Sequence, residues 1–393
     1  MTITDRADHR HFSAANAGVI CCKFFIMKSK MNALVYGGPG KIELKEIPTP
    51  RISKPTDALI RVTRTTICGT DLGIIKGKVP DTKAGTTLGH EGVGVVEEVG
   101  TAVRNYKKGD HVLISCITSD GTCEYCRKGV YAHCEDGGWI LGHLINGTQA
   151  EYVRIPHADN SLHPIPAGAD EEALVMLSDI LPTGFEIGVL NGQVKPGDTI
   201  AIVGSGPIGM SALLTAQFYS PARIYMIDLD TNRLETAKKF GATDTIHSGV
   251  TDAVQKIMAE TKDGVDVAIE AVGIPATFDI CQRIVRPTGH IAVVGVHGHS
   301  VDLQLENLWT RNITLTTGLV STFTTPMLLK NVLSGKLEPQ KLITHHFGLG
   351  DILEAYKVFG NAGAEKAIKV IITPENAAAV PAASADEKKK QPA

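Results

Sequence analysis

Three residues of ligand type stand in short motifs that suggest a catalytic metal site. Cys68 lies in the run ICGTD, His90 in GHEG and Asp179 in LSDILPTGFE. A thiolate, a neutral imidazole and a carboxylate suit Zn²⁺, and a catalytic zinc keeps an open position beside about three protein ligands. Each residue also has an ordinary explanation, since His90 could be a hydrogen-bonded core histidine and Asp179 could cap a helix. Taken together, they predict a Lewis-acid site for an oxygen substrate.

A second group of possible metal ligands follows in the chain. Cys123 and Cys126 form a CxxC pair, and Cys134 follows shortly after it. This spacing is typical of a closed structural zinc site. Asp120 precedes the pair and could be a solvated turn residue before Gly121. We do not expect Cys116 to complete the site, because it lies in a strand-like run.

The run VKPGDTIAIVGSGPIGMSALLTAQF predicts a dinucleotide site. Gly204, Gly206 and Gly209 follow an apolar strand pattern and open an apolar helix pattern, which is the setting that a Rossmann phosphate loop requires. Pro207 and Ile208 complete the loop, whose helix N-terminus favours phosphate charge. The glycines could instead form a turn in a flavodoxin-like fold. The order of strand, glycines and helix favours the dinucleotide.

Asp228 ends the next strand pattern, RIYMID, and predicts the choice of nucleotide. Its carboxylate would accept hydrogen bonds from the ribose hydroxyls and would repel a 2′-phosphate, so NAD is favoured over NADP. Arg233 follows five residues later and leaves NADP open as an alternative.

Composition excludes several classes of partner. The 393 residues carry a net charge of −3 with acids and bases interspersed, which gives no broad basic surface for nucleic acid. No stretch is apolar enough to cross a membrane, so we expect a small-molecule partner. Eight cysteines in a chain of this length do not suggest a disulfide scaffold, and the cytoplasm fits best. Residues 1–30 contain no clean cleavage site, and we expect them to be an extension.

The pattern along the chain predicts two domains. Short, partly alternating apolar runs up to about residue 150 indicate a β unit, and strand patterns alternating with helix patterns after Pro182 indicate a parallel sheet. The final strand-like run, KAIKVII, could return to the first domain. The expected division is an extension at 1–30, a catalytic domain at 31–180 completed by 321–374, a nucleotide domain at 181–320, and a disordered tail at 375–393.

On these motifs the chain resembles the zinc-dependent medium-chain alcohol dehydrogenases across residues 31–373. The resemblance implies an α/β protein with a GroES-like β-barrel catalytic domain and a Rossmann, doubly wound parallel-sheet domain. It also implies a homo-oligomer, either a dimer or a tetramer.

The resemblance assigns roles to the residues of the first metal site. Cys68, His90 and Asp179 match the three catalytic-zinc ligands, with Asp in the third place as in bacterial secondary alcohol dehydrogenases. Glu91 matches a residue that can bind zinc transiently, and Asp71 matches the acid that fixes the histidine tautomer.

Two positions depart from the family pattern. Asp120 stands where the family's structural zinc has its first cysteine, so we expect altered zinc affinity at Asp120, Cys123, Cys126 and Cys134. Gly73 stands where many relatives carry a histidine that accepts the released proton, so another base or water must take it.

Further matches concern substrate and cofactor. Thr70 resembles the hydroxyl that bonds the alcohol oxygen and passes its proton on, although it could simply cap local backbone. Val294 and Gly295 match the strand end beside the nicotinamide. Lys369 matches a basic residue that reaches the pyrophosphate, although it could be merely solvated. Trp139 matches a pocket tryptophan, and core packing explains it equally well.

The predicted function is therefore reversible hydride transfer between a small primary or secondary alcohol and NAD, assisted by Zn²⁺. A metal-free quinone or enoyl reductase of the same superfamily is one alternative. A non-catalytic NAD-binding protein is another, suggested only by Gly73 and Asp120.

Overall fold

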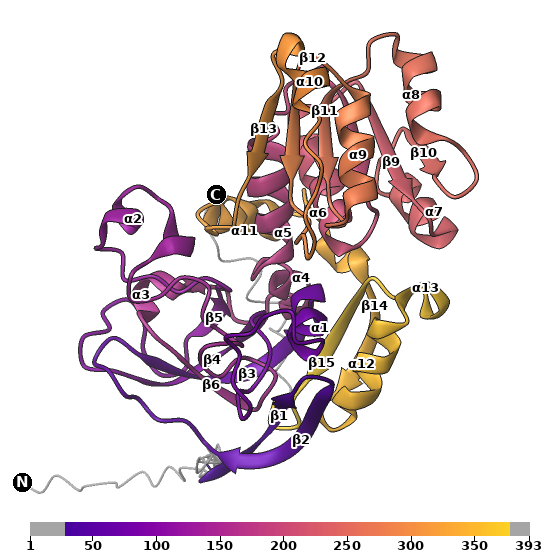
Figure 1. Ribbon diagram of the computed structural model, residues 1–393. Coiled ribbons are helices and arrows are strands. Elements are labelled where there is room, and N and C mark those ends of the chain that lie inside the picture. The colour runs from indigo at the N-terminus through magenta and orange to yellow at the C-terminus, as the bar shows by residue number, and fades with distance from the viewer. Residues whose placement is uncertain (1–27, 378–393) are drawn as a thin grey trace, which may run out of the picture.

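The computed structural model describes residues 28–377, which form two lobes (Figure 1). The predicted extension and the predicted disordered tail lie almost entirely outside this range. Within it, no helix has both the length and the apolar character needed to span a membrane.

The lower lobe in Figure 1 is built on a seven-stranded sheet of order β14-β15-β3-β4-β5-β7, with β6 also paired to β3. Its strands are β3 (Ala58–Thr66), β4 (Gly92–Val99), β5 (His111–Ile114), β6 (Tyr152–Ile155), β7 (Leu162–Pro164), β14 (Ile343–Gly348) and β15 (Lys369–Thr373). All pairs are antiparallel except β14 with β15. A separate antiparallel ribbon pairs β1 (Lys30–Gly38) with β2 (Lys41–Pro48). The late strand β15 thus lies directly against β3.

The upper lobe contains a six-stranded parallel sheet of order β10-β9-β8-β11-β12-β13. Its strands are β8 (Thr199–Val203), β9 (Arg223–Asp228), β10 (Asp244–His247), β11 (Val265–Glu270), β12 (Val285–Val293) and β13 (Thr314–Thr317). The helices that connect them are α6 (Pro207–Ala216), α7 (Thr231–Lys239), α8 (Ala253–Thr261), α9 (Pro275–Ile284) and α10 (Leu305–Leu308).

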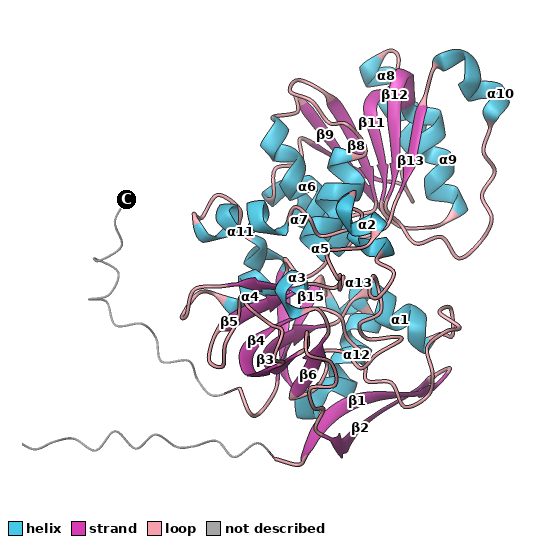
Figure 2. Ribbon diagram, turned by 90° about the vertical axis from the view of Figure 1, so that its left-hand side faces the viewer, coloured by secondary structure: helices cyan, strands magenta, loops and turns pink. Residues whose placement is uncertain are grey.

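Strand β8 shows why this sheet is covered on both faces. Ile200 and Ile202 join one apolar cluster with residues of α6, whereas Ala201 and Val203 join another with residues of α8 and α9. Successive side chains of a strand point to opposite faces, so a strand that is apolar throughout needs helices on both sides. Figure 2 shows this doubly wound arrangement, which the family resemblance implied.

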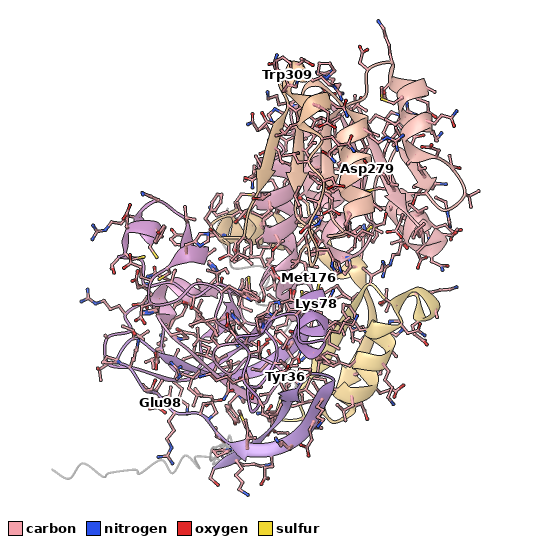
Figure 3. The ribbon with its side chains drawn as sticks, in the orientation of Figure 1. Tyr36, Lys78, Glu98, Met176, Asp279 and Trp309 are labelled. Carbon is pink, nitrogen blue, oxygen red and sulfur yellow. The ribbon has the colours of Figure 1, made fainter. Side chains whose placement is uncertain are left out.

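The two lobes share one apolar core. Met176, labelled where the lobes meet in Figure 3, packs in the same cluster as Leu113 of β5 and Ile200 of β8. The remaining helices are α1 (Gly69–Ile75), α2 (Glu124–Arg127), α3 (Ala158–Ser161), α4 (Glu171–Val175), α5 (Ile180–Thr183), the π-helical η2 (Gly184–Leu190), α11 (Thr325–Leu333), α12 (Ile352–Gly360) and α13 (Ala362–Glu365). Single 3₁₀ turns lie at Tyr131–His133, Gln217–Tyr219, Trp309–Arg311, Pro339–Leu342 and Leu349–Asp351.

Candidate active site

Three segments of the lower lobe bring Cys68, His90 and Asp179 together. Cys68 precedes α1, His90 comes two residues before β4, and Asp179 precedes α5. The Oδ2 atom of Asp179 lies 3.2 Å from His90 Nε2 and 3.6 Å from Cys68 Sγ. All three ligand atoms lie within 4.8 Å of one another. The donor set and its convergence fit one zinc ion.

The local structure of Asp179 argues against a simple helix cap. The residue occupies the N-cap position of α5, yet its side chain makes no capping hydrogen bond. Instead, Oδ1 accepts a 2.6 Å hydrogen bond from Thr183 Oγ1, which leaves Oδ2 facing the imidazole and the thiol. Although burial opposes ionisation, contact with His90 lowers the pKa of Asp179 to about 2. The carboxylate is therefore charged and oriented toward the other two side chains.

Asp71 supports the site from behind. Its Oδ2 accepts a 2.9 Å hydrogen bond from the Cys68 backbone N–H, and its Oδ1 lies 3.5 Å from His90 Nδ1. Burial opposes protonation of His90, but Asp179 and Asp71 outweigh it and raise the imidazole pKa. A carboxylate at Nδ1 also fixes ring orientation, which is the role predicted for Asp71.

Glu91 and Lys369 form a buried ion pair beside this cluster. Glu91 Oε2 lies 2.7 Å from Lys369 Nζ, which also donates to the Ile67 carbonyl at 3.2 Å. The alternative that Lys369 is merely solvated is wrong, because its side chain is 0% exposed. Its predicted contact with the cofactor pyrophosphate stays a prediction. Glu91 Oε1 is buried and accepts no hydrogen bond from the described residues, so one carboxylate oxygen is available beside the cluster.

Asp120, Cys123, Cys126 and Cys134 also converge, with one ligand atom of each inside a 4.8 Å group. The turn explanation for Asp120 agrees with its hydrogen bonds. Its Oδ1 accepts hydrogen bonds from the backbone N–H groups of Thr122 and Cys123, as in a turn. Slight burial opposes ionisation, but these backbone donors lower the pKa of Asp120 to about 2. A charged carboxylate beside three sulfurs fits a zinc ion, and the ligand role stays a prediction.

The glycine turn after β8 has the shape that a dinucleotide loop needs. Gly204 has a φ of +108°, and a Cβ on Gly209 would lie 1.8 Å from the Gly204 carbonyl oxygen. These two positions therefore require glycine. At Gly206 the nearest atom to an added Cβ is Arg233 Nη1 at 3.8 Å, so the space in front of the N-terminus of α6 is open. Pro207 begins α6, and Ile208 follows in its first turn.

Asp228 connects the end of β9 to the glycine turn. Its Oδ2 accepts a 2.6 Å hydrogen bond from Ser205 N, and its Oδ1 accepts from Leu229 N and Asp230 N. The carboxylate thus stands at the carboxyl edge of the sheet beside the glycine loop, where the ribose prediction requires it.

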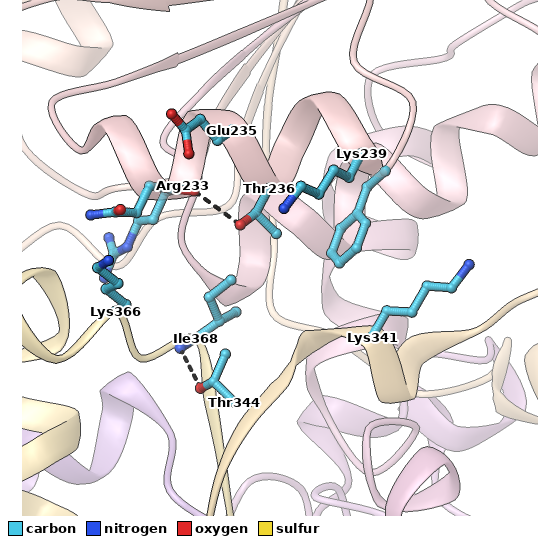
Figure 4. A pocket seen from close by; sticks show the side chains of 10 residues that line it. Arg233, Glu235, Thr236, Lys239, Lys341, Thr344, Lys366 and Ile368 are labelled. Atoms are coloured by element: carbon cyan, nitrogen blue, oxygen red, sulfur yellow. Dashed lines mark hydrogen bonds between the residues drawn. The ribbon is translucent and has the colours of Figure 1, made fainter.

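Arg233 lines a pocket between the two lobes. The pocket has a volume of about 360 Å³ and is also lined by three lysines: Lys239 at the end of α7, Lys341 in the 3₁₀ turn before β14, and Lys366 shortly before β15 (Figure 4). Figure 4 shows Arg233 and Lys366 close to each other, with Lys239 and Lys341 farther along. Arg233 therefore extends from the glycine turn into a basic groove, and its role in choosing the nucleotide stays a prediction.

An apolar cluster lies against the metal-ligand cluster. Its buried members are Cys116, Ile117, Ala132, Ile187 and Val320, and the partly buried Tyr131, Trp139 and Val294 pack on them. Val294 follows β12, and an added Cβ on Gly295 would lie 2.2 Å from Gly273 N, so this strand end is tightly packed. The cluster joins the predicted pocket tryptophan to the predicted nicotinamide wall. It is compatible with either interpretation of Trp139.

Cys116 belongs to this cluster and was expected to stay outside the second cysteine group, whereas the contact of His143 with Trp139 was not predicted. Cys116 Sγ lies 3.7 Å from Asp179 Oδ1, so this thiol belongs to the catalytic side and not to the second cysteine group. His143 stacks on Trp139 with ring centroids 4.1 Å apart, and burial lowers the pKa of His143 to about 4. Trp139 and His143 are the first and last residues of the motif WILGH, and the stacking could have been predicted only if a turn between them had been recognised.

Thr70 and Gly73 lie on α1, directly after Cys68. Thr70 is partly exposed in the first turn of the helix, one residue before the buried Asp71. A Cβ added to Gly73 would have no atom within 4 Å, so a side chain could fit there.

Comparison with known proteins identifies the family. Residues 54–167 match the family model described as the alcohol dehydrogenase GroES-like domain, and residues 207–334 match the zinc-binding dehydrogenase model. An alcohol dehydrogenase of Cupriavidus necator is 36% identical over 376 residues, covering 88% of this chain and 100% of the relative. The chain belongs to the zinc-type alcohol dehydrogenase family. It is accordingly an oxidoreductase, and the GroES-like and Rossmann fold prediction is confirmed.

Solved structures of the alcohol dehydrogenase family agree with this assignment. Zinc-dependent alcohol dehydrogenase 2 from Streptococcus pneumonia, in its apo form, has a TM-score of 0.84 and 57% sequence identity, covering 88% of this chain and 99% of that one. The alcohol dehydrogenase TADH from Thermus sp. ATN1 has a TM-score of 0.82 and 34% identity, covering 88% and 100%. These relatives favour neither the metal-free reductase nor the non-catalytic alternative.

Proposed function

We propose that this protein is a zinc-dependent, NAD-linked dehydrogenase that interconverts small primary or secondary alcohols with aldehydes or ketones. The observation that carries the proposal is the convergence of Cys68 Sγ, His90 Nε2 and Asp179 Oδ2 beside an apolar cluster. That cluster includes Val294, at the end of β12 in the nucleotide-binding lobe. A metal ligand set and the expected nicotinamide wall therefore border the same apolar surface.

Cys68, His90 and Asp179 would hold the zinc ion, which supplies the Lewis acidity that lowers the pKa of an alcohol. Asp71 would keep the His90 ring in one orientation. Glu91, with one oxygen committed to Lys369 and the other free, is proposed as a transient ligand. Asp120, Cys123, Cys126 and Cys134 are proposed to hold a second, structural zinc ion.

Thr70, in the first turn of α1, is proposed to hydrogen-bond the alcohol oxygen through its hydroxyl group and to pass the alcohol proton on. Because Gly73 offers no base, the proton would leave through water or another group, and the pH dependence of turnover should differ from that of relatives with histidine at this position. Trp139 and the aliphatic cluster would favour small substrates.

NAD is proposed as the hydride acceptor, bound across the glycine turn. Gly204, Gly206 and Gly209 let backbone and helix N-terminus approach the pyrophosphate, and Asp228 would bind the ribose hydroxyls. Arg233 is proposed to approach the same ribose, and Lys369 the pyrophosphate.

We also propose that the protein is a homo-oligomer. Strand β13 ends the six-stranded sheet, and Leu315 on this strand is 39% exposed. Trp309, at the far end of the upper lobe in Figure 3, is 72% exposed. An edge strand flanked by exposed apolar side chains is a ready surface for pairing with a second copy.

The test combines metal analysis with a cofactor assay. Purified enzyme should contain zinc and should reduce NAD, followed at 340 nm, with ethanol, propan-2-ol or butane-2,3-diol. The variant Asp179→Asn should lose zinc from the catalytic site and most of its activity, whereas Asp120→Asn should affect only the second site. Undiminished activity after chelation and removal of all zinc would overturn the proposal, and a clear preference for NADP would overturn its cofactor assignment.

A further inference from the structure

Glu186 is a buried carboxylate whose hydrogen bonds all come from one short segment. It lies in the π-helical η2 and is 3% exposed. Its Oε2 accepts from the backbone N–H groups of Ser321 and Thr322 at 2.9 and 3.1 Å. Its Oε1 accepts from the backbone N–H and the hydroxyl of Thr324 at 3.0 and 2.7 Å. The carboxylate is therefore bound by segment 321–324 through four hydrogen bonds and not through a basic side chain.

Segment 321–324 directly follows the pocket residue Val320. Thr322 Oγ1 lies 2.8 Å from Ser115 Oγ, and Ser115 precedes Cys116, whose thiol contacts Asp179. Thr322 has a φ of +60°, a backbone conformation that a β-branched residue adopts only when its surroundings enforce it. The N–H of this strained residue is one of the four donors to Glu186. The carboxylate thus helps to hold an unfavourable turn in place.

The helical stretch formed by α5 and η2, which carries Glu186, begins at the metal-ligand residue Asp179. Asp179 precedes its first turn, Thr183 bonds Asp179 from within it, and Glu186 lies one turn farther along. Ile187, next to Glu186, packs with Val320 in the apolar cluster. Fixing segment 321–324 to this helix therefore fixes one wall of the pocket relative to Asp179. Deviations from regular α-helix, such as a π-helical turn, are frequent at functional sites.

We propose that Glu186 is a positioning residue that sets the width of the substrate pocket by holding Val320 against the helix that follows Asp179. This inference rests on the proposed function, because it assumes that the apolar cluster is where the alcohol lies. Glu186 touches neither substrate nor metal in this account. Loss of the Glu186 carboxylate should weaken discrimination between small and bulky alcohols much more than it slows the hydride-transfer step.

The test is the variant Glu186→Gln, made together with Trp309→Phe. The chain has two tryptophans, so Trp139, which packs in the same cluster as Val320, becomes the sole tryptophan and can be excited selectively over the tyrosines. Each carboxylate oxygen of Glu186 accepts two hydrogen bonds. In glutamine an NH₂ group replaces one of these oxygens and cannot accept, so about half of the four hydrogen bonds should be lost. We expect the acrylamide quenching constant of Trp139 to rise roughly twofold as the wall loosens.

The same variant should show a split between kinetic parameters. The ratio of kcat/KM for ethanol to that for a bulky alcohol such as cyclohexanol should fall roughly tenfold, with kcat for ethanol changing by less than about threefold. Glu151→Gln is the matched control, because Glu151 is also a buried carboxylate that accepts a backbone N–H, from Asn32 at 2.8 Å. It should change neither Trp139 quenching nor the ratio.

A folded Glu186→Gln protein with unchanged quenching and unchanged selectivity would overturn the proposal. If that variant does not fold, Thr324→Val decides the question, since it removes only the hydroxyl donor and should shift both readouts in the same direction by a smaller factor. The quenching measurement needs no turnover. A protein that oxidises no alcohol would therefore refute the proposed function while still testing the role of Glu186.

Discussion

Replacing Lys369 with methionine should destabilise the protein by about 3–5 kcal/mol. The Lys369 ammonium lies 2.7 Å from Glu91, and the two side chains are 0% and 1% exposed. At this separation the Coulomb attraction is roughly 6 kcal/mol for an effective dielectric constant of about 20. Methionine fills much of the same apolar volume, so most of the cost comes from leaving the Glu91 carboxylate buried without its partner.

The assay is urea unfolding at pH 7, followed by fluorescence and by circular dichroism. The double variant Glu91→Gln with Lys369→Met should recover most of the lost stability, because it removes both charges. Lys128→Met is the control, since Lys128 pairs with Glu124 on the surface, and it should cost less than about 1 kcal/mol. A loss below about 1 kcal/mol for Lys369→Met, or a double variant as unstable as the single one, would refute the reasoning. Measuring NAD affinity on the same variant tests the predicted pyrophosphate contact separately.

Three further variants test other parts of the structure. Gly73→His has open space for its side chain, and we expect an added ionisation near pH 6.5 in the profile of kcat/KM, so an unchanged profile would count against the predicted proton route. Asp120→Cys completes a four-thiolate site and should retain zinc roughly tenfold more tightly against a chromogenic chelator; equal or weaker retention would contradict the ligand assignment. Although burial opposes it, hydrogen bonds from Lys54 and Ser53 lower the pKa of Asp57, so its stabilisation is present above the ordinary value of 3.8 and is lost as pH falls below it. Asp57→Asn should therefore cost about 1–3 kcal/mol at pH 7 and flatten the stability profile between pH 5 and 3, measured by urea midpoints.

The ligand clusters were predictable because their residue types lie in short motifs with restricted meanings. Cys68, His90 and Asp179 were proposed as ligands from their residue types and motifs, and the family resemblance then gave each of them a role. The glycines after β8 were predictable for a steric reason that the structure makes explicit, since a side chain at Gly209 would overlap the backbone of Gly204. Such local rules need no knowledge of distant contacts.

Two of the missed contacts join residues far apart in the chain. Lys369 and Glu91 are separated by 278 positions. A lysine in a strand near the C-terminus does not by itself indicate that it is buried and paired with a distant carboxylate. Glu186 is similar, because three of its four donors in segment 321–324 are backbone N–H groups, which nearly every residue possesses. Backbone donors become specific only when a turn aligns them, and the left-handed Thr322 that aligns them here has no signature in its residue type.

The common core of the lobes constrains how this scaffold can be recombined with its relatives. Leu174 of α4 and Leu181 of α5 pack in one cluster with Leu113 from the lower sheet and Ile202 from the upper sheet. A chimaera spliced between the sheets would bring together interior surfaces shaped for different neighbours, leaving voids or clashes at the seam. In a chimaera, segment 171–190 must therefore come from the same parent as the two sheets that it packs against. Crossover points are better placed in solvent-facing loops.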